Sequence, residues 1–333
     1  MNMKKAFASV LAGAMILSMA ACGDSDAASS AAASAPSPAA SGDTYTVGIC
    51  QLVEHVALDA ATQGFQDALV DQLGDSVEFN VQNAQNDTNT CSTIINGFVS
   101  SDVDLILANA TPALQAAAAG TNEIPILGTS ITEYGVALEI ENFSGTVGGN
   151  ISGTSDLAPL DEQAAMLNEW FPDAKNVGLL YCSAEANSQY QVDVVSAELT
   201  KLGYTCTPYA FSDSNDLSAV CTSAVAASDV IYVPTDNTVA SNTGIIDNIC
   251  RPAGVPVVAG EEGICAGCGV ATLSISYYDL GYTTGQMAAK ILTGEADIAE
   301  MPIEYAPATP KFNETICTDL NLTAPEGYTA IEQ

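Results

Sequence analysis

His55 is the only histidine of the 333 residues, and two acids stand near it: Glu54 is adjacent and Asp59 follows four positions later. Such a set could bind a metal or transfer protons. A metal would need His55 and Asp59 on one helix face, whereas the sequence predicts that a helix begins between them. Asp59 then fits the first turn, where the helix dipole favours an acid. For His55 we expect first a place at the lip of a ligand cleft or a ligand contact, second a structural role at the helix entry, and last catalysis or metal binding.

Two further pairs of reactive side chains raise the same question. Cys265 and Cys268 have a CxxC spacing, but no second CxxC exists and the glycines around the pair predict a loop. Free thiols or a local disulfide are therefore favoured over a metal. Glu261 and Glu262 could be a general acid and base, although neighbours in a turn after a strand tend to point apart. No GxSxG, Walker or GxGxxG motif follows a predicted strand, so catalysis is not expected, and a hydrolase using Glu261 or Glu262 stays as an alternative.

The first 42 residues predict export and a lipid anchor rather than a fold. Two lysines at positions 4 and 5 precede a short apolar run, and the letters MAAC at 19–22 are similar to a bacterial lipobox. We expect a signal peptide over 1–21, lipid on Cys22, and a flexible Ser/Ala/Pro tether over 22–42. The protein is then extracytoplasmic and anchored to the cell membrane by lipid. An uncleaved anchor, the alternative, would leave the rest of the chain on the same side.

The charge of the chain is strongly negative, −33 in total. All 40 acids follow Cys22, against only five cations there. Such a surface repels nucleic acid and anionic lipid, so we expect no nucleic-acid partner. The acids are spread along the chain, which favours a solubility or habitat trait over an acidic tail with its own function.

Apolar β-branched runs alternate with amphipathic stretches in two series. The first predicts strands over 44–51, 77–83, 103–108 and 124–128, with helices over 57–73, 88–100 and 112–119. The second predicts strands over 177–181, 204–211, 230–233 and 255–259, and helices over 160–171, 189–202, 217–227, 239–249 and 278–292. This alternation indicates an α/β protein of two doubly wound parallel-sheet lobes, split near 145–153.

Polar residues follow the predicted strands of both lobes, where ligands of open α/β sheets bind. Two such edges facing each other would form a cleft for one small molecule. No cation stands there, so a ligand carboxylate would be held by backbone N–H groups and by hydroxyls such as Thr111, Thr129 and Ser130, which serve equally well as helix caps. An ammonium would be matched by Asp236 or Glu261. These features favour a zwitterion such as an amino acid, or a polar neutral ligand.

Eight motifs in one order carry a resemblance to a known family. They are VGICQLVEHVALDAATQGF, VQNAQND, NATPALQAA, SGTSDLAP followed by FPDAKNVGLLY, SAEANS, IYVPTDNTVAS, VVAGEEG and ISYYDLGYTTGQMAAKILTGE. With them the chain resembles the solute-binding lipoproteins of ABC importers, in the group associated with tryptophan, tyrosine and phenylalanine uptake. The resemblance implies a type I periplasmic-binding-protein fold, three hinge crossings, closure around one ligand, and no catalysis, cofactor or metal. It implies these ligand-binding residues: Glu54, His55, Gln85, Thr111, Thr129, Ser130, Asn187, Ser188, Asp236, Asn237 and Glu261.

One departure from the family pattern concerns the ligand. The chain has TSIT at 129–132 where the family suggests a threonine followed by an Asp-Pro turn. The resemblance therefore does not define the fourth wall of the site, nor the identity of the ligand. An aromatic ligand would need a stacking ring, for which Tyr134, Tyr181, Tyr190 and Tyr277 are candidates, each of which could equally pack inside a lobe. Trp170 is expected in the core of the second lobe.

The sequence thus predicts a monomeric binding protein that captures an amino acid, aromatic by preference, and delivers it to ABC permease subunits. The first lobe is expected over 44–150 plus 276–296, and the second over 151–275 plus 297–333. The alternatives are a sugar or nucleoside ligand in the same fold, and a ligand sensor that feeds a signalling partner.

Overall fold

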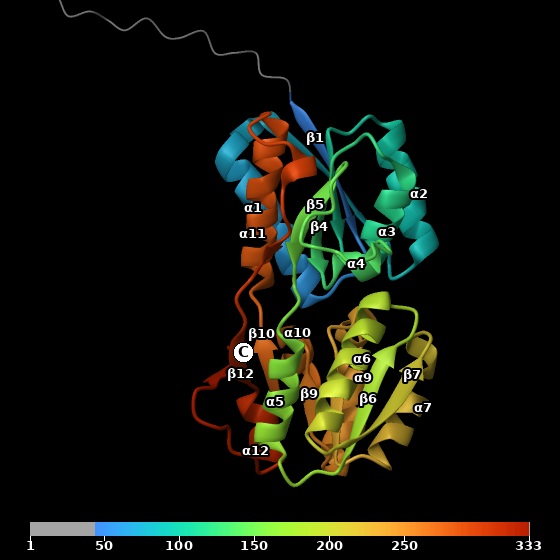
Figure 1. The fold of residues 1–333 in the computed structure, drawn as a ribbon, viewed down its shortest axis with the longest axis vertical. Coiled ribbons are helices and arrows are strands. Elements are labelled where there is room, and N and C mark those ends of the chain that lie inside the picture. The colour runs from blue at the N-terminus through green and yellow to red at the C-terminus, as the bar shows by residue number, and fades with distance from the viewer. Residues whose placement is uncertain (1–43, 333) are drawn as a thin grey trace, which may run out of the picture. The chain divides into compact units, whose positions relative to one another are not determined.

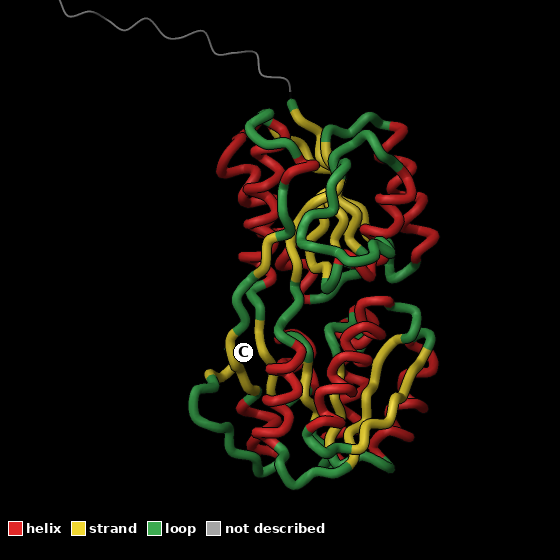
Figure 2. Tube along the Cα trace, in the orientation of Figure 1, coloured by secondary structure: helices red, strands yellow, loops and turns green. Residues whose placement is uncertain are grey.

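The computed structural model describes residues 44–332, which form two sheets with helices packed on them (Figures 1 and 2). The expected signal peptide, the lipidation of Cys22 and the tether lie outside the described residues. No helix within 44–332 is both long and apolar enough to cross a membrane. The prediction of two parallel-sheet α/β lobes is confirmed.

The first sheet has six strands, and all its strand pairings are parallel. Their order across the sheet is β11 (Glu304–Tyr305), β5 (Ile151–Ser155), β4 (Ile126–Ile131), β3 (Leu105–Asn109), β1 (Tyr45–Gln51) and β2 (Val77–Asn83). The central strands β3 and β4 are buried along their whole length, as a parallel sheet covered on both faces requires. Helices α1 (Val56–Leu73) and α11 (Tyr277–Leu292) cover one face, and α2 (Thr88–Ser100) and α3 (Thr111–Gly120) cover the other (Figure 1).

The second sheet has seven strands and is parallel except where β10 meets β12. Their order is β13 (Thr329–Ala330), β12 (Thr309–Phe312), β10 (Ala271–Ser274), β9 (Val257–Ala259), β8 (Val230–Val233), β6 (Asn176–Cys182) and β7 (Thr205–Phe211). Its helices are α5 (Leu160–Trp170), α6 (Ala186–Lys201), α7 (Ser214–Val225), α8 (Asn237–Ala240), α9 (Thr243–Ala253), α10 (Glu262–Cys268) and α12 (Glu314–Asp319). Trp170 packs in the core of this lobe, as expected.

Helix α11 returns to the first lobe and lies tightly against α1, a contact built on glycine. A Cβ added to Gly281 would lie 1.9 Å from the carbonyl oxygen of Ala61, and one added to Gly64 would lie 2.1 Å from that of Tyr278. Only glycine lets the two backbones come this close. The contact fixes the late part of the chain onto the lobe formed by its beginning.

The chain crosses between the two sheets three times within the described residues. The crossings follow β5, β10 and β11, at 156–159, 275–276 and 306–308. Strand β5 and strand β11 therefore belong to the first sheet, whereas the sequence suggested that this lobe stops at 150 and, after the return, at 296. The reason is that the run Ile151–Ser155 is short and contains a glycine, so it lacks the strand signal of its neighbours.

Three local predictions differ from the structure. The stretch around Cys265 and Cys268 is helix α10 rather than a loop. The helix expected over 239–249 is divided into α8 and α9. Helix α6 begins at Ala186 rather than 189, so Asn187 and Ser188 lie in its first turn. Helices α6, α8 and α10 each have an acid at the preceding position, and in α8 and α10 its carboxylate accepts backbone N–H groups.

Candidate functional site

A pocket lies where strand ends of the two sheets come together. Twelve residues line it: His55, Leu58, Ser130, Thr132, Asp156, Asn187, Thr235, Asp236, Asn237, Ala240, Glu261 and Tyr277. Within the described chain, no lysine or arginine belongs to this lining.

The polar residues of the lining stand at the carboxyl ends of strands, the edge where α/β sheets bind ligands. Asp156 comes directly after β5, and Asp236 and Glu261 come shortly after β8 and β9. Ser130 lies at the end of β4, where the register with β5 shifts between Gly128 and Ile131. The φ of Ser130 is 56°, a left-handed conformation that turns its backbone away from the regular ladder.

Three buried polar atoms of the lining have no hydrogen-bond partner in the protein: Ser130 Oγ, Asp156 Oδ1 and Asn187 Oδ1. Buried polar groups in native proteins are almost always paired. The amide oxygen of Asn187 can only accept a hydrogen bond, and so can the carboxylate oxygen of Asp156 when that acid is ionised. The pocket is therefore suited to a molecule that brings N–H or O–H donors.

Asp156 is the acid with a free oxygen in this pocket. Its side chain is 4% exposed, and its Oδ2 accepts a hydrogen bond of 2.8 Å from the hydroxyl of Tyr277. Burial raises the pKa of Asp156 above its ordinary value, while the hydrogen bond from Tyr277 opposes that rise. A cation placed beside Oδ1 would relieve the cost of burying this carboxylate.

Asp236 and Glu261 also line the pocket, but backbone groups already occupy their carboxylates. Asp236 accepts from the N–H groups of Cys182, at 2.7 Å, and of Val239, at 2.9 Å. Glu261 accepts from Gly263, at 2.6 Å, and from Ile264. Burial, followed by the charge of a neighbouring acid, raises the pKa of Asp236 to about 8.

Burial likewise raises the pKa of Glu261 to about 7, against the lowering effect of the N–H groups of Gly263 and Ile264. Both acids are therefore helix caps first. The sequence suggested that Asp236 or Glu261 would bind a ligand ammonium group. Their carboxylates already accept backbone hydrogen bonds, whereas Asp156 keeps one oxygen without a partner.

Glu185, the residue before α6, holds the loop that begins α8. Its Oε2 accepts from the backbone N–H of Asn237 at 3.0 Å and from the side-chain Nδ2 of Asn237 at 2.7 Å. Its Oε1 accepts from the backbone N–H of Thr238 at 2.9 Å and from its hydroxyl at 2.8 Å. Glu185 is 4% exposed, and these charge-assisted bonds compensate its burial.

Two hydrogen bonds join the lobes beside the pocket. His55 Nε2 lies 3.3 Å from Asn237 Oδ1, and Asn86 Nδ2 donates to Thr238 Oγ1 at 3.1 Å. Burial lowers the pKa of His55, against the effects of Asn237, Asp59 and Glu185, which raise it. His55 thus lines the pocket and contacts the opposite lobe.

The comparisons with known proteins give the site its family. The sequence profile described as "ABC transporter substrate binding protein" matches residues 46–330, nearly the whole described chain. The chain belongs to the ABC transporter substrate-binding proteins. A protein named tyrosine-binding protein from Clostridioides difficile (strain R20291) is 37% identical over 263 residues, which cover 77% of this chain and 75% of the relative.

Two solved structures are similar to this binding protein. A crystal structure of an ABC domain in complex with L-Trp from Streptococcus pneumonia is 29% identical, has a TM-score of 0.82 and covers 87% of this chain and all of that one. A ligand-free, open structure of a substrate binding protein with adhesive properties from Clostridium difficile is 36% identical but has a TM-score of only 0.66, with the same coverage. The structure is thus more similar to the ligand-bound protein than to the open, ligand-free one, although its sequence identity to the latter is higher.

The structure brings six of the eleven expected site residues of this binding protein together in the pocket lining. They are His55, Ser130, Asn187, Asp236, Asn237 and Glu261. The remaining five lie outside it. Thr111, Thr129 and Ser188 are buried within their own lobes, while Glu54 and Gln85 are exposed, and Glu54 lines a separate surface hollow beside Gln51 and Asp59.

The other six lining residues had not been singled out as binding residues from the sequence. They are Leu58, Thr132, Asp156, Thr235, Ala240 and Tyr277. Asp156 follows a strand that the sequence did not show, so the rule that picks polar residues after strands passed over it. Tyr277 was a candidate ring for stacking, and it alone of the four candidate tyrosines lines the pocket.

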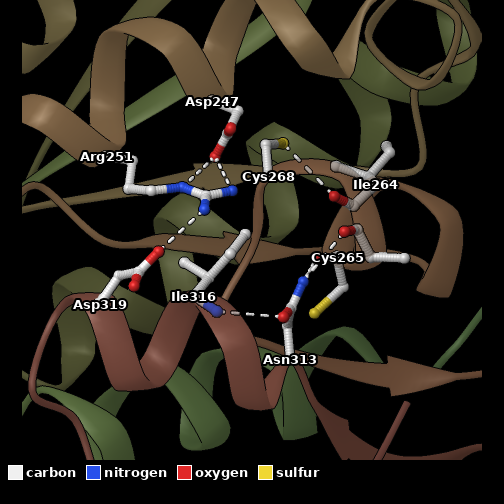
Figure 3. A network of polar contacts seen from close by, with 9 residues as sticks. Asp247, Arg251, Ile264, Cys265, Cys268, Asn313, Ile316 and Asp319 are labelled. Atoms are coloured by element: carbon white, nitrogen blue, oxygen red, sulfur yellow. Dashed lines mark hydrogen bonds and ion pairs between the residues drawn. The ribbon is translucent and has the colours of Figure 1, made fainter. Parts of the chain in front are cut away.

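The cysteines take no part in the pocket, and all nine within the described residues are free. Cys265 and Cys268 are both buried in α10, where burial raises the pKa of each thiol. The amide of Asn313 binds the carbonyl oxygen of Cys265 at 3.1 Å, and Cys268 Sγ lies 3.3 Å from that of Ile264 (Figure 3). No group of three or more metal-ligating side chains occurs within 44–332.

The single arginine of the sequence belongs to the same part of the second lobe. Arg251 is paired with Asp247 at 2.7 Å and with Asp319 at 2.9 Å, which joins α9 to α12 (Figure 3). Its guanidinium is therefore used within the second lobe rather than in the pocket lining.

Proposed function

We propose that this protein captures an L-amino acid, aromatic by preference, and delivers it to the permease of an ABC importer. The observation that carries the proposal is the set of unpartnered buried atoms, Ser130 Oγ, Asp156 Oδ1 and Asn187 Oδ1, around one pocket without a cation. An α-ammonium group supplies three N–H donors and a positive charge to the two acceptors. The hydroxyl of Ser130 is suited to the ligand carboxylate.

The aromatic preference rests on the apolar part of the lining and on relatives. Leu58, Ala240 and the ring of Tyr277 offer an apolar surface next to the polar end. The relative of 37% identity is named for tyrosine, and the structure with a TM-score of 0.82 contains L-Trp. Tyrosine, tryptophan and phenylalanine are therefore the first ligands to test.

The proposed mechanism is closure of the two lobes without chemical change in the ligand. A ligand that contacts both lobes binds the closed state more strongly and shifts the open–closed equilibrium toward it. The permease then recognises the closed form outside the cytoplasm, where lipid on Cys22 would keep the protein at the membrane. Of Glu261 and Glu262, the acids that a hydrolase could use, the first accepts from the backbone N–H groups of Gly263 and Ile264, and the second is paired with Lys311.

Isothermal titration calorimetry on residues 43–333, which form a compact unit of their own, tests this proposal. We expect L-tyrosine, L-tryptophan or L-phenylalanine to bind at one site, and D-galactose, myo-inositol and adenosine to give no heat. Mass spectrometry after overnight incubation should recover the amino acid unchanged. Binding of a sugar or nucleoside in place of every amino acid, or the appearance of a product, would contradict the proposal.

A further inference from the structure

The two hydrogen bonds between the lobes end on two consecutive residues, Asn237 and Thr238, at the start of α8. Asn237 accepts with its amide oxygen, and the amide nitrogen of the same side chain donates to another group. Thr238 accepts with its hydroxyl oxygen, and the proton of that hydroxyl is donated to another group. In each case this other group is the carboxylate of Glu185.

The carboxylate fixes which way the amide of Asn237 faces. An ionised carboxylate only accepts hydrogen bonds, so the group 2.7 Å from Glu185 Oε2 must be the NH2 of Asn237. The amide oxygen then faces His55, at 3.3 Å, and the Nε2 of His55 must carry the proton. Rotation of the amide by half a turn would place its oxygen against Glu185 and break both contacts.

The same carboxylate fixes the hydroxyl of Thr238. A threonine hydroxyl has a single proton, and Thr238 gives it to Glu185 Oε1 at 2.8 Å. Its lone pairs are left to accept from the side-chain amide of Asn86, at 3.1 Å. Without Glu185 the hydroxyl could turn its proton toward Asn86 and lose this polarity.

We propose that Glu185 is a positioning residue for closure: it presets Asn237 and Thr238 as acceptors for the hydrogen bonds that His55 and Asn86 bring from the first lobe. The inference rests on the proposed function and deepens it. Glu185 is absent from the pocket lining and so acts on the ligand through these two residues. Its effect falls on the closed state, because only that state contains the contacts between the lobes.

The first test compares Glu185→Gln with the wild type and with Glu198→Gln, which changes a partly exposed glutamate of helix α6. The probe is L-tyrosine, or L-tryptophan if the wild type binds it more tightly, and stopped-flow mixing gives the two rate constants. Loss of one or two hydrogen bonds that exist only in the closed state should raise the dissociation rate constant about 5- to 30-fold. The association rate constant should stay within about twofold, and Glu198→Gln should behave as the wild type.

The second test reverses one contact from the other lobe and keeps Glu185 intact. Asn86 is exposed and has a φ of 62°, which aspartate tolerates, so Asn86→Asp leaves the fold in place. The new carboxylate faces an oxygen whose proton points to Glu185, so closure should weaken. Adding Glu185→Gln frees that proton for the new acid, so the double variant should close better than Asn86→Asp alone. This sign reversal is not expected of a residue that only stabilises its own lobe.

Small-angle X-ray scattering without ligand measures the open fraction of each variant. We expect a larger radius of gyration for Glu185→Gln and Asn86→Asp, and a smaller one for the double variant than for Asn86→Asp. Additive effects of the two substitutions, or a dissociation rate constant of Glu185→Gln equal to that of the wild type, would overturn the inference. If Glu185→Gln proved unstable, an Asn86→Asp variant that closes as well as the wild type would overturn it by itself. If the wild type bound no amino acid, the proposed function would be rejected. The role of Glu185 could still be judged separately, because the scattering comparison needs no ligand.

Discussion

At the scale of single residues, the polar atoms of the pocket differ in whether they have a hydrogen-bond partner within the protein. Asp236 and Glu261 have their hydrogen bonds within the second lobe, whereas Asp156 keeps Oδ1 unpartnered. A buried carboxylate with half its acceptor capacity unused is costly in a stable protein. Because of this cost, we expect the binding of a positively charged ligand group to depend more on Asp156 than on the other acids of the pocket.

Replacing Asp156 with asparagine removes this charge and keeps the size of the side chain. Hydrogen bonds to charged groups are worth about 1.5–3 kcal/mol, so the dissociation constant for the amino acid should rise about 10- to 100-fold. The ligand-free variant should unfold at the same temperature as the wild type or higher, because a buried charge is gone. Calorimetric titration and thermal unfolding measure the two effects.

The matched control is Asp161→Asn, an exposed acid in the first turn of the next helix. It should leave the dissociation constant unchanged. Equal weakening by both substitutions would mean that general electrostatics, rather than the free oxygen of Asp156, holds the ammonium group.

The sequence predicted part of this pocket because polar residues after strands can be read directly from the order of residues. His55, Asn187 and Glu261 were found in this way. Asp156 could not be found so, because its strand, β5, is five residues long with a central glycine and is recognisable only through its pairing with β4. Which acids remain unpartnered is also decided by capping geometry, which spacing alone does not show.

At the scale of elements, the contact of α1 with α11 holds the returning chain on the first lobe. The two helices meet at Gly64 and Gly281, where any Cβ would collide with backbone atoms of the other helix. The helices themselves were predicted from their periodicity. Their close approach was not, because a glycine within a helix also reads as a weak point of that helix.

Gly281→Ala should destabilise the protein by about 1–3 kcal/mol, because the added methyl group forces two backbones apart. Gly97→Ala is the matched control: Gly97 is exposed in α2 with open space around it, so alanine there should stabilise by up to about 1 kcal/mol. Urea unfolding of the two variants measures both. A neutral Gly281→Ala would show that the helices are further apart than described.

At the scale of the whole molecule, the net negative charge and the buried acids both make the folded protein less stable as the pH rises. The chain has a net charge of −33, and burial raises the pKa of Asp236 to about 8 and of Glu261 to about 7. Both groups bind protons more tightly in the folded than in the unfolded protein, where carboxyl pKa values are about 4. Their contribution to stability is therefore complete below that value and is lost as the pH rises through about 7 to 8.

We expect the melting temperature of residues 43–333 to fall by several degrees between pH 5.5 and pH 8.5. Repulsion among the surface acids adds to the loss, and that part should shrink in 0.5 M salt while the part from buried acids remains. Glu261→Gln should flatten the pH dependence that persists in salt. Scanning calorimetry at three pH values gives the measurement, and a melting temperature that rises with pH would contradict it.

The three crossings of the chain between the sheets limit how the lobes can move. Backbone segments at 156–159, 275–276 and 306–308 tie the same two bodies together at separate points. A single linker would leave the bodies free to twist and slide, whereas three parallel tethers restrict them to a swing about one axis. Binding of a ligand in the pocket would then change mainly one quantity, the angle between the lobes. Two fluorescent dyes attached to opposite lobes would therefore detect the amino acid through a change in their energy transfer.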